Sequence, residues 1–447
     1  MLSRRPLVLA PILGSPAFSW RNGRAQTSGD LDISLFVKLA QTAERGKLDA
    51  IFLGDSFGIK DDKAGLKGME GSGSALIFES ITLVGALAMA TKRIGLAATV
   101  STSYNHPFSI ARQIASIDHM SGGRMGWNVV TSAFDAEAQN FGLPAKQTSE
   151  QRYERAREFV DVVLDLWDSW EDEAIIRDRA SGRFFDSAKV HRLNHEGRNF
   201  NVRGPLNVSR SPQGRPVMFQ AGTSEAGYDI AAELSDAMYV KAPTFEAGKA
   251  FYEHVKAKLP KFGRSDDELS LMPGLTVVTG TSEKDARDKF MASIETLRDE
   301  EGLMLIKQLL GGLDLSPYPV DEPIPQLPHI DAAMKAARMV FERRGRRMTT
   351  RELMGNLAAN LGHLMMFGTP GEVAAEMIRW RDERAADGFI LMSYYLPDGL
   401  EEFVDHVVPE LQERGAFRTE YEGQTFREHL GLARPANRFR QRSMERV

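Results

Sequence analysis

The stretch GRMGWNVVTS, residues 123–132, decides how the rest of the chain is interpreted. Most of its residues are apolar and β-prone, which predicts a short buried strand. Asn128 lies in the middle of that strand, and the stretch ends in Thr131 and Ser132. A polar side chain inside a buried strand needs a hydrogen-bond partner. Asn128 therefore either ties down backbone or meets something that is not protein.

The overall composition is that of an ordinary globular protein. The chain has 447 residues, of which 42% are hydrophobic and 26% charged, and its net charge is −5. A balance this close to neutral gives no indication of a nucleic-acid or polyanionic partner. There is no cysteine, which excludes disulfides, thiolate metal sites and a cysteine nucleophile and fits the reducing cytoplasm where we expect the protein.

The apolar run at the N-terminus, residues 7–13, is interrupted by Pro11. This break favours a first core strand over the uninterrupted apolar helix of a signal peptide. No stretch approaches the ~18 consecutive apolar residues of a membrane helix. We therefore expect a protein that does not associate with membranes.

Short apolar runs alternate with amphipathic segments on both sides of the opening stretch. The expected strands are residues 6–13, 49–56, 94–101, 124–132, 216–222, 237–243, 269–280 and 388–395. The main expected helices are residues 33–46, 78–91, 108–123, 149–170, 224–235, 282–300 and 369–388. Repeated βα units imply parallel strands, and eight of them predict an α/β fold, a (β/α)8 TIM barrel. A doubly wound open sheet is the alternative.

Three segments interrupt this alternation, and we expect them to be insertions into a single domain spanning residues 1–447. They are residues 58–73, 174–214 and 301–348, the last of which contains a Pro-rich connector. Residues from about 413 to 447 are expected to form an arm over the surface or over a partner. His191 and His195 have the spacing of a helical metal pair, but their surroundings are irregular and no third ligand stands out, so no metal site is predicted.

Polar residues gather where the predicted strands end. In a TIM barrel the active site lies at the carboxyl ends of the strands. Asp55 lies at the end of the second strand, Ser101 ends the third and His106 follows it, and Asn128 belongs to the fourth. Asp55 and His106 are the obvious acid–base candidates, and the other groups can only form hydrogen bonds.

The turn AGTSEAG, residues 221–227, follows the fifth strand and opens a helix with Thr223 and Ser224. Small residues and a helix N-terminus favour binding of an anion such as phosphate. The alternative is that Ser224 simply caps its helix. The helix that begins at Ser149, with Tyr153 in its first two turns, offers a second N-terminus to the same ligand.

Several of these motifs together resemble the bacterial-luciferase-like FMN-dependent monooxygenases. They are SGGRMGWNVVTS, DSFG, RYERA, QAGTSEAG and the C-terminal GAFRTEYEGQTFREHLGLARPANRF. The resemblance is to the subgroup of nitrilotriacetate monooxygenase component A, EDTA monooxygenase, dibenzothiophene-sulfone monooxygenase and the pristinamycin synthase flavoenzymes, and it runs from about Trp20 to Arg438. It implies a TIM barrel that takes reduced FMN from a separate flavin reductase and oxygenates a small molecule through a flavin peroxide. It also implies a homodimer or homotetramer.

The resemblance implies roles for individual residues near the flavin ring. Asp55 would lie by the ring edge, Ser101 would contact FMN, and Asn128 would sit at the ring system. Apart from the resemblance, flavin chemistry that must exclude water calls for a lid, and the insertions at residues 58–73 and 301–348 are the candidates. Phe57 and His329, next to or inside them, are candidate residues of the substrate pocket, and an ordinary loop histidine is the alternative for His329.

At the phosphate, the resemblance implies that Tyr153 and Ser224, with Thr223 beside them, hold the group. Relatives commonly carry His where this chain has Ser149, which can form a hydrogen bond but brings no positive charge. Relatives also often carry a His before the pair Trp20–Arg21, and none stands there. The substrate therefore cannot be copied from a relative. A deazaflavin-dependent oxidoreductase of the same superfamily and a non-catalytic flavin-binding protein are the alternatives.

Overall fold

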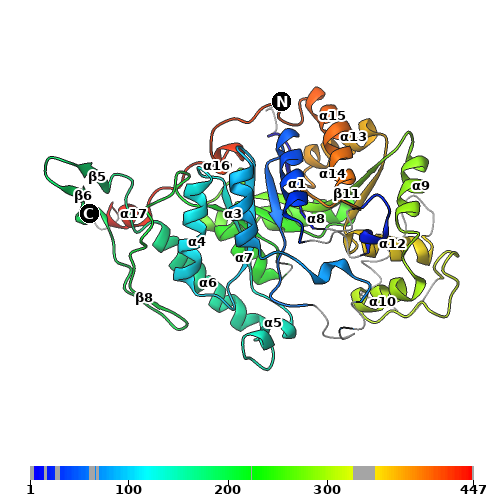
Figure 1. Ribbon diagram of the computed structural model, residues 1–447, viewed down its shortest axis with the longest axis horizontal. Coiled ribbons are helices and arrows are strands. Elements are labelled where there is room, and N and C mark those ends of the chain that lie inside the picture. The colour runs from blue at the N-terminus through cyan, green and yellow to red at the C-terminus, as the bar shows by residue number, and fades with distance from the viewer. Residues whose placement is uncertain are drawn as a thin grey trace. The chain divides into compact units, whose positions relative to one another are not determined.

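The computed structural model describes residues 5–14, 18–25, 31–59, 66, 70–222, 224–325 and 348–444. Contacts within the chain divide it into two compact units, which are described separately. Unit 1 comprises residues 1–48, 63–78 and 239–419, and unit 2 comprises residues 49–62, 79–238 and 420–447. Figure 1 shows the elements of both units.

Unit 2 is built on a parallel sheet of the strands β2, β3, β4, β9 and β10, in that order. Their bounds are Ala50–Leu53, Gly95–Ser101, Met125–Val130, Val217–Gln220 and Ala237–Val240. In the register, Asn128 of β4 lies opposite Thr99 of β3 on one side and opposite Phe219 of β9 on the other. The opening stretch of the sequence is therefore the central strand of this sheet.

Helices cover the sheet of unit 2, and the residues at their ends explain where they begin. They are α3 (Ser80–Ala90), α4 (Pro107–Met120), α5 (Asp135–Asn140), α6 (Ser149–Trp167) and α7 (Glu225–Leu234). Thr148 and Gln151 form the capping box of α6, and Ser224 caps α7. Figure 1 shows α3, α4 and α6 side by side, which their mutual contacts confirm.

The second insertion of the sequence forms short antiparallel pairs in unit 2. One is β5 (Ile175–Asp178) with β6 (Arg183–Phe185), and the other is β7 (His195–Glu196) with β8 (Asn201–Val202). The two histidines of this insertion do not share a site. His191 Nε2 lies 2.9 Å from Glu171, and His195 Nε2 lies 3.1 Å from Glu158.

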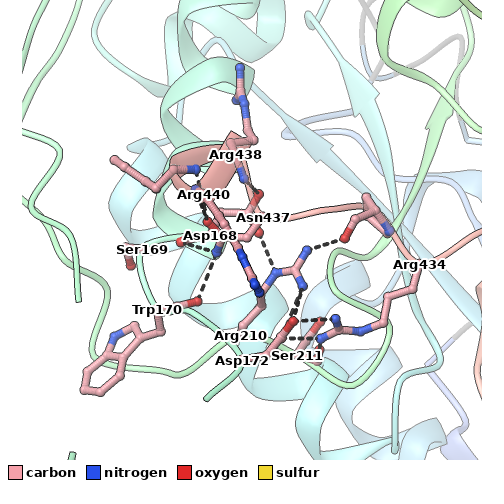
Figure 2. A network of polar contacts seen from close by, with 12 residues as sticks. Asp168, Ser169, Trp170, Asp172, Arg210, Ser211, Arg434, Asn437, Arg438 and Arg440 are labelled. Atoms are coloured by element: carbon pink, nitrogen blue, oxygen red, sulfur yellow. Dashed lines mark hydrogen bonds and ion pairs between the residues drawn. The ribbon is translucent and has the colours of Figure 1, made fainter. Parts of the chain in front are cut away.

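The C-terminal segment of unit 2 contains α16 (Phe426–His429) and α17 (Arg438–Met444) and folds back onto the end of α6. Figure 2 shows the polar network that holds it there. The Asn437 amide donates to the Asp168 carbonyl oxygen at 2.7 Å, and both guanidinium ends of Arg434 pair with Asp172 at 2.6 and 2.8 Å. Arg210 completes the network through Asp168 at 2.6 Å.

Unit 1 carries the parallel strands β1, β13, β11 and β12, paired in that order. Their bounds are Val8–Pro11, Gly388–Leu391, Ser270–Thr279 and Leu364–Gly368. Its α-helices are α1 (Ile33–Arg45), α8 (Phe245–Lys256), α9 (Glu283–Ser293), α10 (Asp299–Leu309), α12 (Thr350–Asn360), α13 (Pro370–Asp382), α14 (Asp398–Glu402) and α15 (Val408–Glu413). Over the described ranges, no helix has the length and apolar character needed to cross a membrane.

All eight predicted strands are present, as β1, β2, β3, β4, β9, β10, β11 and β13. The sequence interpretation missed a ninth, β12, which is short and pairs only with the second half of β11. The helix predicted at residues 282–300 is wrong, because α9 ends at Ser293 and α10 begins at Asp299. Between them Leu297 turns inward to pack with Ile306 and Leu353, and this burial outweighs helix continuity.

Candidate functional site

A cavity of about 260 Å³ lies in unit 2 at the carboxyl ends of β2, β3 and β4. Its lining includes Asp55, Phe57, Glu79, Ser101, Ser132 and Glu137. Three of the residues expected at a flavin or its substrate, Asp55, Phe57 and Ser101, therefore meet around one space. They come from loops and strand ends far apart in the sequence, which only the parallel sheet brings together.

Asp55 is held in place by the start of a helix. Its two carboxylate oxygens accept hydrogen bonds from the backbone N–H groups of Ser56, at 2.7 Å, and Ser80, at 2.9 Å. Ser80 is the first residue of α3, so the carboxylate lies at a helix N-terminus, where negative charge is favoured. Burial raises the pKa of Asp55, and the two backbone hydrogen bonds oppose that rise.

Ser101 belongs to a buried hydrogen-bonding cluster at the ends of β3 and β4. Ser132 Oγ lies 2.9 Å from Ser101 Oγ and 3.2 Å from Glu137 Oε1. The same Glu137 oxygen accepts the Phe57 backbone N–H at 3.2 Å, which ties Phe57 to the cluster. Ser132 has a φ of 42°, a left-handed conformation that costs energy for a residue other than glycine and is typical of functional sites.

Only one of the two polar atoms of the Asn128 side chain has a hydrogen-bond partner in the described part of the chain. Its side chain is 3% exposed, and its Nδ2 group donates to Thr99 Oγ1 at 2.8 Å on the neighbouring strand. Its Oδ1 atom is buried and has no hydrogen-bond partner within the part of the chain that the structure describes. A buried acceptor left unpaired is costly, so this oxygen is an acceptor for which the described part of the chain supplies no donor, although Asn128 is not among the residues that line the cavity.

Tyr153 and Ser224 meet at the N-terminus of α7. The phenol oxygen of Tyr153 lies 3.1 Å from Ser224 Oγ, which also accepts the Gly227 backbone N–H at 3.2 Å. A Cβ added at Gly222 or Gly227 would lie 3.0 or 3.1 Å from the phenol oxygen, so the absence of side chains lets Tyr153 approach the turn. The result is a small polar cradle at a helix N-terminus.

The remaining candidates lie apart from these groups or outside the described ranges. Ser149 is the first residue of α6 and is exposed, one turn before Tyr153. His106 caps α4, where its Nδ1 accepts the Phe108 N–H at 3.3 Å. Thr223 and His329 lie outside the described residues.

The sequence interpretation missed Glu137, which is 4% exposed and connects Phe57 with Ser132. Nothing in the sequence marks a glutamate of a six-residue helix as a buried connector, because its role depends on where α5 packs. Ser132, by contrast, is the last residue of the predicted strand 124–132, a position where a polar residue faces the expected active site. Across the described ranges, no three His, Asp or Glu side chains are grouped to hold a metal ion.

The cradle and the cavity belong to a chain with clear relatives. Residues 17–387 match the luciferase-like monooxygenase family. The chain is 44% identical to N-acetyl-S-(2-succino)cysteine monooxygenase of Bacillus subtilis strain 168, over 95% of this chain and 96% of the relative. It is 43% identical to nitrilotriacetate monooxygenase component A of Aminobacter aminovorans, over 94% of each chain.

A solved structure gives the same result for the fold. Riboflavin lyase, determined with a modified FMN and riboflavin, matches this chain with a TM-score of 0.81 and 31% identity over 96% of each chain. The predicted (β/α)8 barrel of the bacterial luciferase type is thereby confirmed, and the open-sheet alternative is excluded. Sequence and structure agree that the chain belongs to the luciferase-like monooxygenase family, whose named relatives are oxidoreductases.

Proposed function

We propose that this protein is a monooxygenase that uses reduced FMN and O2 to oxygenate a small organic substrate. A separate flavin reductase supplies the reduced FMN, either in transient contact or by diffusion. The observation that carries the proposal is the buried, unpaired Oδ1 atom of Asn128, in a chain that belongs to this family. It is a hydrogen-bond acceptor in the carboxyl half of β4, two residues before the strand ends, and this fold builds its active sites at the carboxyl ends of its strands.

The described residues fit the two ends of an FMN molecule. For the ring system, Asn128 offers an acceptor and Ser101 a hydroxyl group. For the phosphate, Tyr153 and Ser224 offer hydroxyl groups at the N-terminus of α7, whose partial positive charge favours an anion. Ser149 adds a further hydroxyl group without charge, so binding depends on hydrogen bonds and helix termini rather than on a cation at that position.

Bound reduced FMN supplies the reaction with O2, and the protein supplies orientation and shelter from water. Asn128 fixes the orientation of the ring through its free acceptor. Asp55, held by two backbone N–H groups, presents a fixed carboxyl group to the cavity. Phe57 lines the cavity and packs edge to face on Phe141, with ring centroids 5.0 Å apart, which limits the access of water on that side.

Two titrations test the cofactor part of the proposal. The protein is titrated with FMN and, without oxygen, with reduced FMN, and a deazaflavin is added as competitor. We expect reduced FMN to bind and the deazaflavin not to displace it. If neither flavin form binds, the proposal is wrong, and displacement by the deazaflavin favours a deazaflavin-dependent oxidoreductase.

The oxygenation itself is tested with a flavin reductase in the same reaction. The named substrates of the two relatives, N-acetyl-S-(2-succino)cysteine and nitrilotriacetate, are polycarboxylates and are the first compounds to try, with dibenzothiophene sulfone as a neutral compound. We expect a label from ¹⁸O2 in one product. Tight flavin binding with oxygen uptake no greater than the reductase control would indicate a non-catalytic flavin-binding protein. Sedimentation measures the expected homodimer or homotetramer.

A further inference from the structure

Three polar side chains of unit 2, those of Ser101, Ser132 and Glu137, form a chain of hydrogen bonds whose direction can be derived. Ser132 Oγ lies 2.9 Å from Ser101 Oγ and 3.2 Å from Glu137 Oε1, and all three side chains are buried. A serine hydroxyl group carries one proton, so Ser132 can donate to only one of its two neighbours. The other contact needs a proton from the neighbour itself.

Glu137 determines the direction because it acts only as an acceptor. Its Oε1 atom accepts the Phe57 backbone N–H at 3.2 Å, and its Oε2 atom accepts the Phe134 backbone N–H at 3.3 Å. Backbone N–H groups can only donate, and a carboxylate has no proton to give. The Ser132 proton is therefore directed to Glu137, and Ser132 Oγ accepts the proton of Ser101.

Ser101 is thereby left as an acceptor toward any further partner. Its Oγ atom also accepts the Ser103 backbone N–H at 3.1 Å, so its proton and one of its two lone pairs are used within the protein. Ser101 lines the cavity of about 260 Å³ at the carboxyl ends of the strands. Its second lone pair is what it can offer to a molecule in that cavity, and this lone pair requires an N–H or O–H group in return.

The flavin ring changes its hydrogen-bonding character when it is reduced. In the oxidised ring the N5 atom is an acceptor, whereas two-electron reduction places a hydrogen on N5 and makes it a donor. A serine that can only accept matches the reduced ring and meets a second lone pair in the oxidised ring. A buried polar group of fixed direction discriminates between two ligands because the wrong one leaves it unpaired.

We propose that Glu137, acting through Ser132, fixes Ser101 as the acceptor for the N5–H group of reduced FMN, so that the protein selects the reduced cofactor. Glu137 and Ser132 are positioning residues, because they act on the flavin through Ser101. The inference rests on the proposed oxygenase function and deepens it by naming the residues that select the redox state of the cofactor. All of these residues belong to unit 2.

The same hydrogen bonds could serve only to join β3 to β4 at their carboxyl ends. A purely structural role would change the binding of both forms of FMN alike and leave the ratio of their dissociation constants unaltered. That ratio also sets the midpoint potential of the bound flavin, because a tenfold change in it corresponds to about 30 mV for two electrons. The ratio and the potential are therefore the measurements that separate the two roles.

The deciding variant is Ser132→Ala, which removes the acceptor of the Ser101 proton. Ser101 can then turn this proton toward the cavity and donate it to the oxidised ring. We expect oxidised FMN to bind about 3- to 10-fold more tightly and the affinity for reduced FMN to be retained. The midpoint potential of the bound flavin should consequently fall by about 15–30 mV. Fluorescence titration with oxidised FMN, anaerobic titration with reduced FMN and spectroelectrochemistry on the whole protein provide the three values.

Ser103→Ala is the matched control, because it removes a serine hydroxyl group from the adjacent loop and keeps the backbone N–H that Ser101 accepts. Ser103 Oγ donates to the Thr131 carbonyl oxygen at 2.7 Å and takes no part in the chain from Glu137 to Ser101. The ratio of the two dissociation constants should be the same in Ser103→Ala as in the unaltered protein. An unchanged ratio in Ser132→Ala, or an equal change in both variants, would overturn the inference.

Two substitutions at Glu137 test whether this residue controls the direction. Glu137→Gln can still present an oxygen to Ser132 and should retain most of the preference for reduced FMN. Glu137→Ala removes the acceptor and should change the ratio in the same direction as Ser132→Ala. A folded Glu137→Ala protein with an unaltered ratio would contradict the role of Glu137. Thermal unfolding shows which variants fold, and Ser132→Ala decides the question if Glu137→Ala does not.

The outcomes also separate this inference from the proposed function. A ratio that depends on Ser132, without incorporation of oxygen from ¹⁸O2, supports the selection of reduced flavin and counts against the oxygenase. Incorporation of ¹⁸O, with a ratio that Ser132→Ala leaves unaltered, supports the oxygenase and overturns the inference. Failure of both forms of FMN to bind would overturn both.

Discussion

The two ends of the sheet in unit 2 are built differently. At the amino end, Phe426 of α16 is fully buried, and a Cβ added at Gly95 or Gly126 would lie 2.7 or 3.1 Å from its ring. The next residue, Arg427, forms a bidentate ion pair with Asp236 at 2.9 and 3.0 Å, and both side chains are buried. The C-terminal segment thus closes this end with close packing and paired charge.

The carboxyl end of the sheet, by contrast, is neither filled by side chains nor fully paired in hydrogen bonds. It holds the cavity, the unpaired Oδ1 of Asn128 and the left-handed backbone of Ser132. The same strand, β4, therefore has one end that stabilises the fold and one end where binding groups are left available. The comparison predicts that substitutions at the amino end reduce stability with little effect on FMN affinity. Substitutions at the carboxyl end should reduce FMN affinity with little effect on stability.

The largest effect is expected from Arg427→Met. The substitution leaves the buried Asp236 carboxylate without its main partner, which should lower the free energy of unfolding by about 3–5 kcal/mol. Urea unfolding measures the loss, and FMN affinity of the folded protein should be unchanged. Arg434→Met, which breaks an ion pair that is about 40% exposed, is the control and should cost about 1 kcal/mol or less. Equal losses in the two variants would contradict the comparison.

Asp118 gives the amino end a dependence on pH. Its carboxyl group accepts the Met125 N–H at the start of β4, and burial raises its pKa from its ordinary value of 3.8 to about 6. Between about pH 4 and 6, Asp118 therefore holds a proton in the folded chain that it has lost in the unfolded chain. This contribution to stability is fully present below about pH 4 and is lost as the pH rises through 6.

The size of the Asp118 effect is about 3 kcal/mol, from the shift in pKa. It is measured as the difference in unfolding free energy between the protein and Asp118→Asn from pH 4 to 7. We expect this difference to change across that range and to be constant above pH 7. A difference independent of pH would show that Asp118 titrates normally and would remove this feature from the amino end.

Gly95→Ala tests the packing of Phe426 directly. The added methyl group would lie too close to a ring that is packed on all sides, which should cost about 1–3 kcal/mol. In a Phe426→Leu background the same substitution should cost clearly less, because the obstructing ring is gone. Additive losses would mean that the strain has another source. Chemical denaturation of the four proteins in this cycle provides the measurement.

Asn128→Leu is expected to separate binding from stability at the carboxyl end. It replaces the amide by an apolar group of similar size, which removes a buried unpaired oxygen but also the hydrogen bond that Nδ2 donates to Thr99. The two effects oppose each other, so the unfolding free energy should change by less than about 1 kcal/mol. FMN affinity should fall by up to about tenfold, because one hydrogen bond to the cofactor is worth at most about 1.5 kcal/mol. Fluorescence titration checks the affinity, and unaltered binding would mean that FMN does not use Asn128.

Ser224→Asp should have the smallest effect, a several-fold loss of FMN affinity with the fold intact. A carboxylate in the cradle would repel the phosphate, although aspartate caps a helix as well as serine does. Ser224→Ala is the control, since it removes the hydroxyl group without adding charge and should weaken binding less. Equal affinity of Ser224→Asp and the unaltered protein would move the phosphate site elsewhere.

The sequence was informative wherever the signal is local. Alternating apolar runs placed all eight predicted strands, and capping residues such as Thr148 and Ser224 marked where helices begin. These features could be predicted because a helix end or a buried strand is decided by neighbours within a few residues. The missed strand β12 and the break between α9 and α10 depend on packing against distant segments, so local sequence patterns could not predict them.

The same distinction between local and long-range features applies to the candidate functional site. The sequence by itself determined the family motifs, the polar residues at the strand ends and the glycines at residues 222 and 227. Only the tertiary structure decided that Glu137 links Phe57 to Ser132 and that Asn128 keeps one oxygen unpaired. The physical reason is that a hydrogen bond formed or left unmade depends on which atoms the fold brings within about 3 Å, and residues over 100 positions apart meet only when strands pair and helices pack.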